Sequence, residues 1–116
     1  MLTGAMLGLM RQLGMDIIVL TEEINDSEFF ASRLTRTETL RLLKSMSKTV
    51  QSLPVETRER LHEIDWAAWE ALPKVLASPS KHPLQIWVAI KELTPMTVQQ
   101  LSGYKKAHPA LFSIVP

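Results

Sequence analysis

Apolar residues recur at helical spacing through the first part of the chain. They follow one another at steps of three and four residues, which is the repeat of one face of an α-helix. The stripe comprises Leu2, Met6, Leu9, Leu13, Ile17, Leu20 and Ile24. It predicts a long helix whose stripe lies in the core of a helical bundle or, alternatively, faces a partner as a coiled-coil seam does. Gly8 and Gly14 weaken this helix but permit close approach of a neighbouring helix.

A polar break at Asn25-Asp26-Ser27 predicts the end of the first helix and the cap of a short one over residues 28–32. Thr35 and Glu38 have the spacing of a capping box, which predicts a second long helix that starts at Thr35 and ends at Pro54. Its apolar arc comprises Leu40, Leu42, Leu43, Met46, Val50 and Leu53. Its basic stripe comprises Arg41, Lys44 and Lys48.

The second half of the chain predicts shorter helices. A polar helix is expected over residues 56–62, and Asp65 is a suitable N-cap for a helix over residues 66–72. Pro73 is expected to end or kink that helix, because proline lacks the backbone donor. After a loop, Pro83 opens a helix with a buried stripe of Ile86, Ala89, Ile90 and Leu93. Thr94-Pro95 begins the last helix, and residues 110–116 form an apolar tail. The fold class is therefore all-α.

Composition narrows the class of protein. The 116 residues fit one domain spanning 1–116, and 46% of them are hydrophobic, which suffices for a core. Cysteine is absent, so disulfides and thiolate metal sites are excluded. The net charge of +1 gives no overall attraction to nucleic acid, and we find no pattern for a metal or a cofactor. Arg11 and Asp16 interrupt the first apolar run, which favours a soluble, cytoplasmic protein without a membrane span.

Three separated pieces resemble a known family. The first runs from Asp26 to Thr35, with the sequence DSEFFASRLT, and the second is the helix from Leu42 that ends in Leu53-Pro54. The third is His62-Glu63-Ile64-Asp65-Trp66, followed by Ile86-Trp87 and Leu93-Thr94-Pro95-Met96. In this order the pieces resemble the HepT-like branch of the HEPN superfamily, over about 70 of 116 residues.

The resemblance implies a four- to five-helix bundle that forms an intertwined or face-to-face homodimer. HepT-like proteins are typically ribonuclease toxins paired with a nucleotidyltransferase-type antitoxin. Their signature is an arginine, four residues, a histidine, one residue and a tyrosine. In metal-independent RNA cleavage, the histidine would move protons and the arginine would stabilise phosphate charge.

This chain departs from the family where the signature is expected. The segment from Leu72 to Pro79 reads LPKVLASP and contains neither arginine nor histidine nor tyrosine. Lys74 is the nearby cation, and a lysine does not reproduce the guanidinium fork. A rearranged site would have to use Lys74, Ser78 and His82, although His82 is more often a solvated loop residue.

Two further groups have a structural and a functional interpretation. Arg41, Lys44 and Lys48 are candidate RNA-binding residues, although three cations on an amphipathic helix usually form its solvated face. Trp66, Trp69 and Trp87 are expected in the core or at a dimer interface.

The leading hypothesis is a HepT-like helical dimer that lacks ribonuclease activity and acts by binding itself and a nucleotidyltransferase-like antitoxin. The alternatives are an active ribonuclease with the rearranged site and a purely structural dimer without a role in RNA binding.

Overall fold

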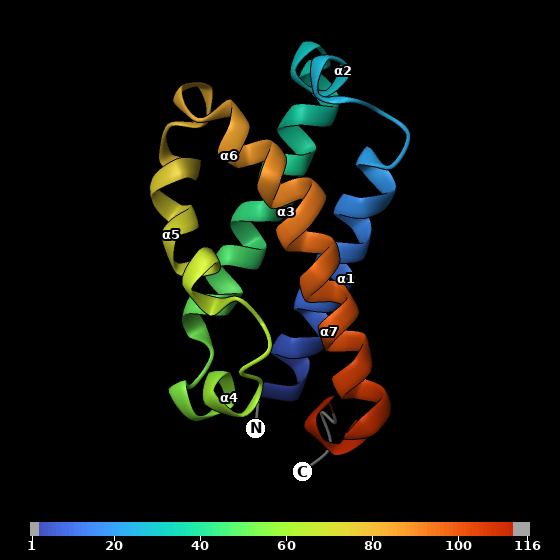
Figure 1. Ribbon diagram of the computed structural model, residues 1–116, viewed down its shortest axis with the longest axis vertical. Coiled ribbons are helices and arrows are strands. Elements are labelled where there is room, and N and C mark those ends of the chain that lie inside the picture. Colours follow the sequence, from blue (N-terminus) through green and yellow to red (C-terminus); the bar gives the residue numbers. More distant parts are fainter. Residues whose placement is uncertain (1–2, 113–116) are drawn as a thin grey trace.

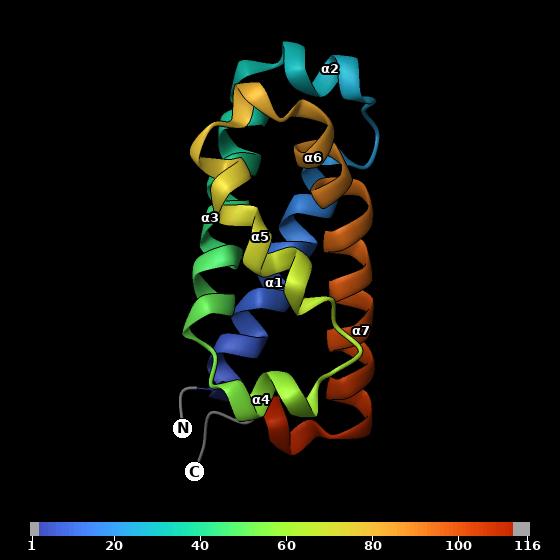
Figure 2. The ribbon, with the colours of Figure 1, turned by 60° about the vertical axis from the view of Figure 1, so that its left-hand side comes forward.

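Three long helices set the length of the molecule, which measures 44 × 26 × 21 Å along its principal axes. The computed structural model describes residues 3–112. Helices α1 (Thr3–Thr21), α3 (Arg33–Ser52) and α7 (Thr94–Ala107) run along the long axis (Figure 1). The view turned by 60° shows α5 (Trp66–Ala77) beside α3, against which it packs (Figure 2). The described residues contain helices and turns and no strand, which confirms the all-α prediction.

Helix α1 packs against both α3 and α7. At Gly14 the packing is so tight that an added Cβ would clash with Val98 Cγ2 and lie 3.3 Å from Met46 Cε. A Cβ added at Gly8 would meet no neighbouring atom within 4 Å. The expectation that a glycine allows close helix approach is therefore confirmed for Gly14 alone of these two.

The buried face of α1 differs from the predicted stripe. Its buried residues are Gly4, Leu7, Met10, Gly14, Ile17 and Thr21. In the stripe, Leu9 is 49% exposed and Leu20 is 37% exposed, while Leu2 lies outside the described residues. The stripe residue Ile17 is fully buried, and Met6, Leu13 and Ile24 pack partly buried against the core. The prediction was wrong for Leu9 and Leu20, because the face with Gly14 gives the closest approach to α3 and α7.

The N-terminal caps explain where α2 (Asp26–Ala31) and α3 begin. Asn25 and Glu28 form a reciprocal capping box, in which each side chain accepts from the other residue's backbone N–H. Ser32 caps α3 by accepting from the N–H of Thr35. The predicted cap at Thr35 was wrong, because Ser32 takes that position and the Glu38 side chain pairs with Arg41 instead.

Helix α4 (Val55–Arg60) follows Pro54, and α5 begins after Asp65, whose side chain accepts from Ala68 N at 3.0 Å. This confirms the predicted Asp65 cap. Of the end or kink expected at Pro73, the end was wrong, because α5 continues to Ala77 with Pro73 inside it. Leu72 and Leu76 are buried on either side of Pro73, and their burial offsets the lost backbone hydrogen bond.

The last third of the chain is one nearly continuous helical path. The short turn η1 (Pro79–Lys81) precedes α6 (Pro83–Val88), the π-helical turn η2 (Ala89–Leu93) and α7, and η3 (Pro109–Phe112) follows. Pro83 opens α6. Of the predicted stripe, Ile86, Ala89 and Ile90 are buried, whereas Leu93 is only partly buried against the core. Pro95 lacks the N–H that an α-helical bond to Lys91 requires, which accounts for the widened turn before it. Of the apolar tail, residues 113–116 lie outside the described part of the chain.

The tryptophans pack as expected for a core. Trp69 is fully buried, and its Nε1 donates to Thr97 Oγ1 at 3.0 Å, which ties α5 to α7. Trp66 and Trp87 are half-buried against the core. Trp87 stacks beside Phe29, with ring centroids 5.6 Å apart.

Helix α1 also has the length and composition of a membrane span. It is the one such helix within residues 3–112, and core helices of soluble proteins meet the same criteria. Here it packs along α3 and α7, and Arg11 Nε donates to Ser102 Oγ of α7 at 2.8 Å. Its buried face therefore belongs to the bundle.

Candidate functional site

The end of α5, η1 and the start of α6 form the corner where the resemblance places the family signature. Lys74 lies exposed in the last turn of α5, and Ser78 ends that helix with its N–H donating to Val75 O. His82 is half-buried at the start of α6, and its side chain makes no capping hydrogen bond. Among the described residues, no hydrogen bond or ion pair joins the side chains of Lys74, Ser78 and His82. The structure therefore shows no assembled acid–base couple at this corner.

An apolar groove lies on the side of α5 that faces α6. Its volume is about 390 Å³. The lining residues are Ala68, Ala71, Leu72, Val75, Leu84, Gln85, Val88, Ala89 and Leu93, of which Gln85 alone has a polar side chain. The α5 wall of the groove includes the small side chains of Ala68 and Ala71. Leu84 is 71% exposed and Val88 is 40% exposed at its edge. This apolar groove is the kind of surface that becomes buried in a protein–protein contact.

A cationic groove lies between α5 and α3. Its volume is about 410 Å³, and it brings Lys44 and Lys48 of α3 together with residues of the predicted signature segment. The lining residues are Lys44, Ser47, Lys48, Gln51, Pro73, Leu76 and Ala77. None of them is acidic, so Lys44 and Lys48 line the groove with no carboxylate among its walls. The arrangement suits an anion such as a phosphate.

The third predicted RNA-binding residue is engaged elsewhere. The Arg41 guanidinium forms an ion pair with Glu38, one turn away on α3. The hydrogen bond from Arg41, together with its charge, holds the pKa of Glu38 below its ordinary value. Lys44 and Lys48 are therefore the members of the basic stripe that line the groove. The wall formed by Pro73, Leu76 and Ala77 was missed, because contact between α3 and α5 leaves no local signal in the sequence.

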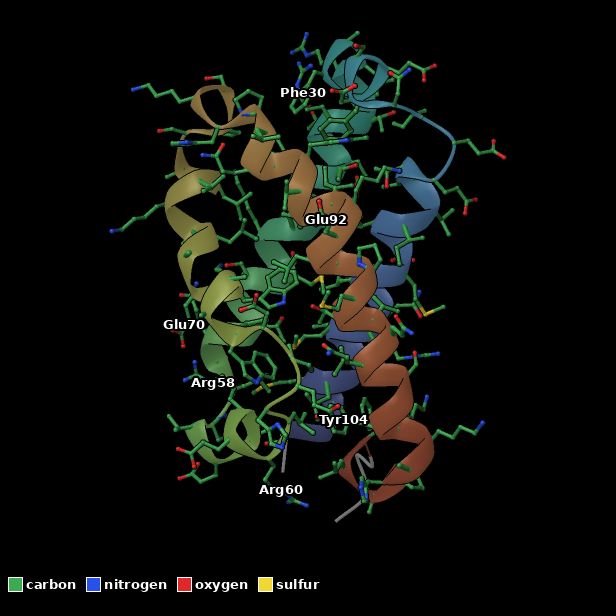
Figure 3. The ribbon with its side chains drawn as sticks, in the orientation of Figure 1. Phe30, Arg58, Arg60, Glu70, Glu92 and Tyr104 are labelled. Carbon is green, nitrogen blue, oxygen red and sulfur yellow. The ribbon has the colours of Figure 1, made fainter. Side chains whose placement is uncertain are left out.

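The remaining polar contacts fix loops. Arg58 pairs with Glu70, which holds α4 against α5, and both side chains are labelled in Figure 3. Tyr104 donates to Glu63 Oε1 at 2.9 Å, and Gln100 Nε2 donates to the Glu63 carbonyl at 2.7 Å. Burial raises the pKa of the Tyr104 hydroxyl, and its hydrogen bond to Glu63 raises this pKa further. These bonds anchor the loop before α5 to α7. Within residues 3–112, no cluster of histidine and carboxylate side chains could hold a metal ion.

Comparisons with protein-family models, with curated proteins and with solved structures found no match to this chain.

Proposed function

We propose that this chain is a HepT-like helical protein that acts by binding other proteins and lacks the ribonuclease centre of that family. Its partners are a second copy of itself and a nucleotidyltransferase-like antitoxin. The observation that carries the proposal is the apolar groove beside the corner where the signature is expected. The groove offers a protein-binding surface, whereas the corner offers no paired arginine and histidine.

The exposed Leu84 supports the protein-binding part of the proposal. A leucine that is 71% exposed next to an alanine-lined groove leaves apolar area in water, and burying it against a partner is favourable. A twofold-related copy would place its own Leu84 and Val88 over the alanines of the first, because a symmetric interface uses the same patch on both copies.

Replacement of Leu84 tests the homodimer. Light scattering and sedimentation should show a dimer for the wild-type chain, and Leu84→Glu should weaken the dimer by about 30-fold or more, as expected for a central interface residue. Leu34→Glu is the matched control, because Leu34 is 85% exposed on α3 and does not line the groove. A wild-type chain that stays monomeric, or a Leu84→Glu chain that dimerises as before, would contradict the proposal.

The antitoxin and the loss of cleavage need separate measurements. Co-expression with a nucleotidyltransferase encoded by a neighbouring gene should give a complex, and Leu84→Glu is expected to disrupt it.

The purified chain should leave RNA intact. Cleavage that His82→Ala abolishes would instead establish the alternative, an active ribonuclease that uses Lys74, Ser78 and His82.

The cationic groove supports a second function, phosphate contact with RNA. RNA affinity should fall steeply with salt, and Lys44→Glu should lower it by about tenfold, because each lysine at a phosphate releases counterions. Lys105→Glu on α7 is the control, since Lys105 is exposed and does not line this groove. Binding that neither salt nor Lys44→Glu alters, or no binding at all, would favour the purely structural dimer.

A further inference from the structure

An aromatic cavity lies at the opposite end of the bundle from α4, where α2 and the start of α3 meet η1 and α6. Figure 3 labels Phe30 at this end. The cavity has a volume of about 490 Å³, within the range of small-molecule sites. Phe29, Phe30 and Leu40 line one side, and Ile86 and Pro83 line the other. The cavity could therefore hold the apolar part of a small ligand.

The walls of this cavity are held firmly. Phe29 is fully buried and packs edge-to-face on Phe30, with ring centroids 5.0 Å apart. Trp87 supports both rings from behind, and Lys91 Nζ lies 5.1 Å from the Trp87 ring centroid. Rigid aromatic walls lose little conformational freedom when a ligand binds.

Arg36 is the charged group that lines the cavity. It is half-buried, and its guanidinium donates to the backbone carbonyl of Phe30. Within residues 3–112, no carboxylate lies within ion-pair distance of Arg36. The guanidinium fork has five N–H donors, so donors remain for a ligand beyond the bond to Phe30. A partly desolvated cation without a counter-ion gains from an anion brought to it.

We propose that this cavity binds a small organic monocarboxylate with an aromatic or branched apolar body. The carboxylate would accept hydrogen bonds from Arg36, and the Ser80 hydroxyl at the rim would supply a further donor. A single cation in apolar surroundings matches one negative charge better than the two of a phosphate monoester. This site is separate from the apolar groove and the cationic groove, and it does not depend on the proposed function.

The test uses the full chain with 4-phenylbutyrate as the probe, measured by calorimetry and by NMR of the Phe30 and Ser80 amides. The carboxylate should bind and shift these amides, whereas the neutral alcohol 4-phenylbutanol should bind at least about tenfold more weakly. Inorganic phosphate should not shift them. Absence of carboxylate binding, equal binding of the alcohol, or equal binding of phosphate would each overturn the proposal.

Variants assign the binding to Arg36. Arg36→Gln should weaken 4-phenylbutyrate binding by about tenfold or more, while Arg33→Gln, an exposed arginine on the same helix that does not line the cavity, should leave it within about twofold. If Arg36→Gln fails to fold, Ser80→Trp replaces it, because Ser80 is exposed and a large side chain there would fill the cavity. A Ser80→Trp chain, or a folded Arg36→Gln chain, that binds the probe like the wild type would refute the site.

Discussion

At the scale of single residues, Gly8 and Gly14 of α1 have opposite roles. Gly14 lies against Met46 of α3 and against Thr94 and Val98 of α7, whereas Gly8 has open space around it. A glycine is therefore required for helix packing at position 14, whereas at position 8 it affects only the helix propensity of α1.

Alanine replacements should separate these roles. Gly14→Ala should lower the free energy of unfolding, because overpacking costs about 1–3 kcal/mol and the stiff Val98 side chain cannot turn away. Gly8→Ala should raise the free energy of unfolding by up to about 1 kcal/mol through helix propensity. Denaturant unfolding followed by tryptophan fluorescence measures both. Equal stability of the two variants would contradict the packing of α1.

Glu38 and Arg41 provide a pH-dependent contact on the surface of α3. The Arg41 hydrogen bond and charge lower the pKa of Glu38 from its ordinary value of 4.5. The contact therefore stabilises the fold at pH values above the pKa that Glu38 has in the unfolded chain. This stabilisation is lost as the pH falls through the lower pKa that Glu38 has in the folded chain. NMR titration should show the low pKa of Glu38, and Arg41→Gln should raise it to the ordinary value. A Glu38 pKa that Arg41→Gln leaves unchanged would show that the pair does not form.

At the scale of helices, caps define the boundaries more sharply than hydrophobic periodicity does. The Asp65 cap and the break at residues 25–27 were identifiable from the sequence, because such side chains satisfy backbone donors within three residues. Pro73 was misread, because the burial of Leu72 and Leu76, which carries α5 past it, depends on helices distant in the sequence.

The Asp65 cap can be measured directly. Asp65→Ala should lower the free energy of unfolding by about 1 kcal/mol, because Ala68 N loses its acceptor. Asp16→Ala is the control, since Asp16 is exposed within α1 and accepts only from Gln12. It should change the free energy of unfolding by no more than about 0.5 kcal/mol. Equal losses in thermal unfolding would argue against the cap.

At the scale of the whole molecule, the all-helical class and most helix positions followed from the sequence. The buried face of α1 followed only in part, because Leu7, Leu9, Met10 and Leu20 offer apolar surface in several directions and the choice among them depends on Gly14. Of the candidate site, the basic stripe was recognised, but its partner wall at Pro73 was not. The family membership and the partners remain predictions that the binding measurements address.

The contact of α1 with α7 has a consequence for biosynthesis. Helices α1 and α3 are synthesised before α7, so the face of α1 around Gly14 stays uncovered until Thr94 and Val98 pack against it. Until then, the nascent chain exposes an apolar surface along its first helix. Chaperones bind such surfaces, and the same surfaces promote aggregation when synthesis stalls. A ribosome that pauses before α7 emerges would thus prolong the exposure of this apolar surface.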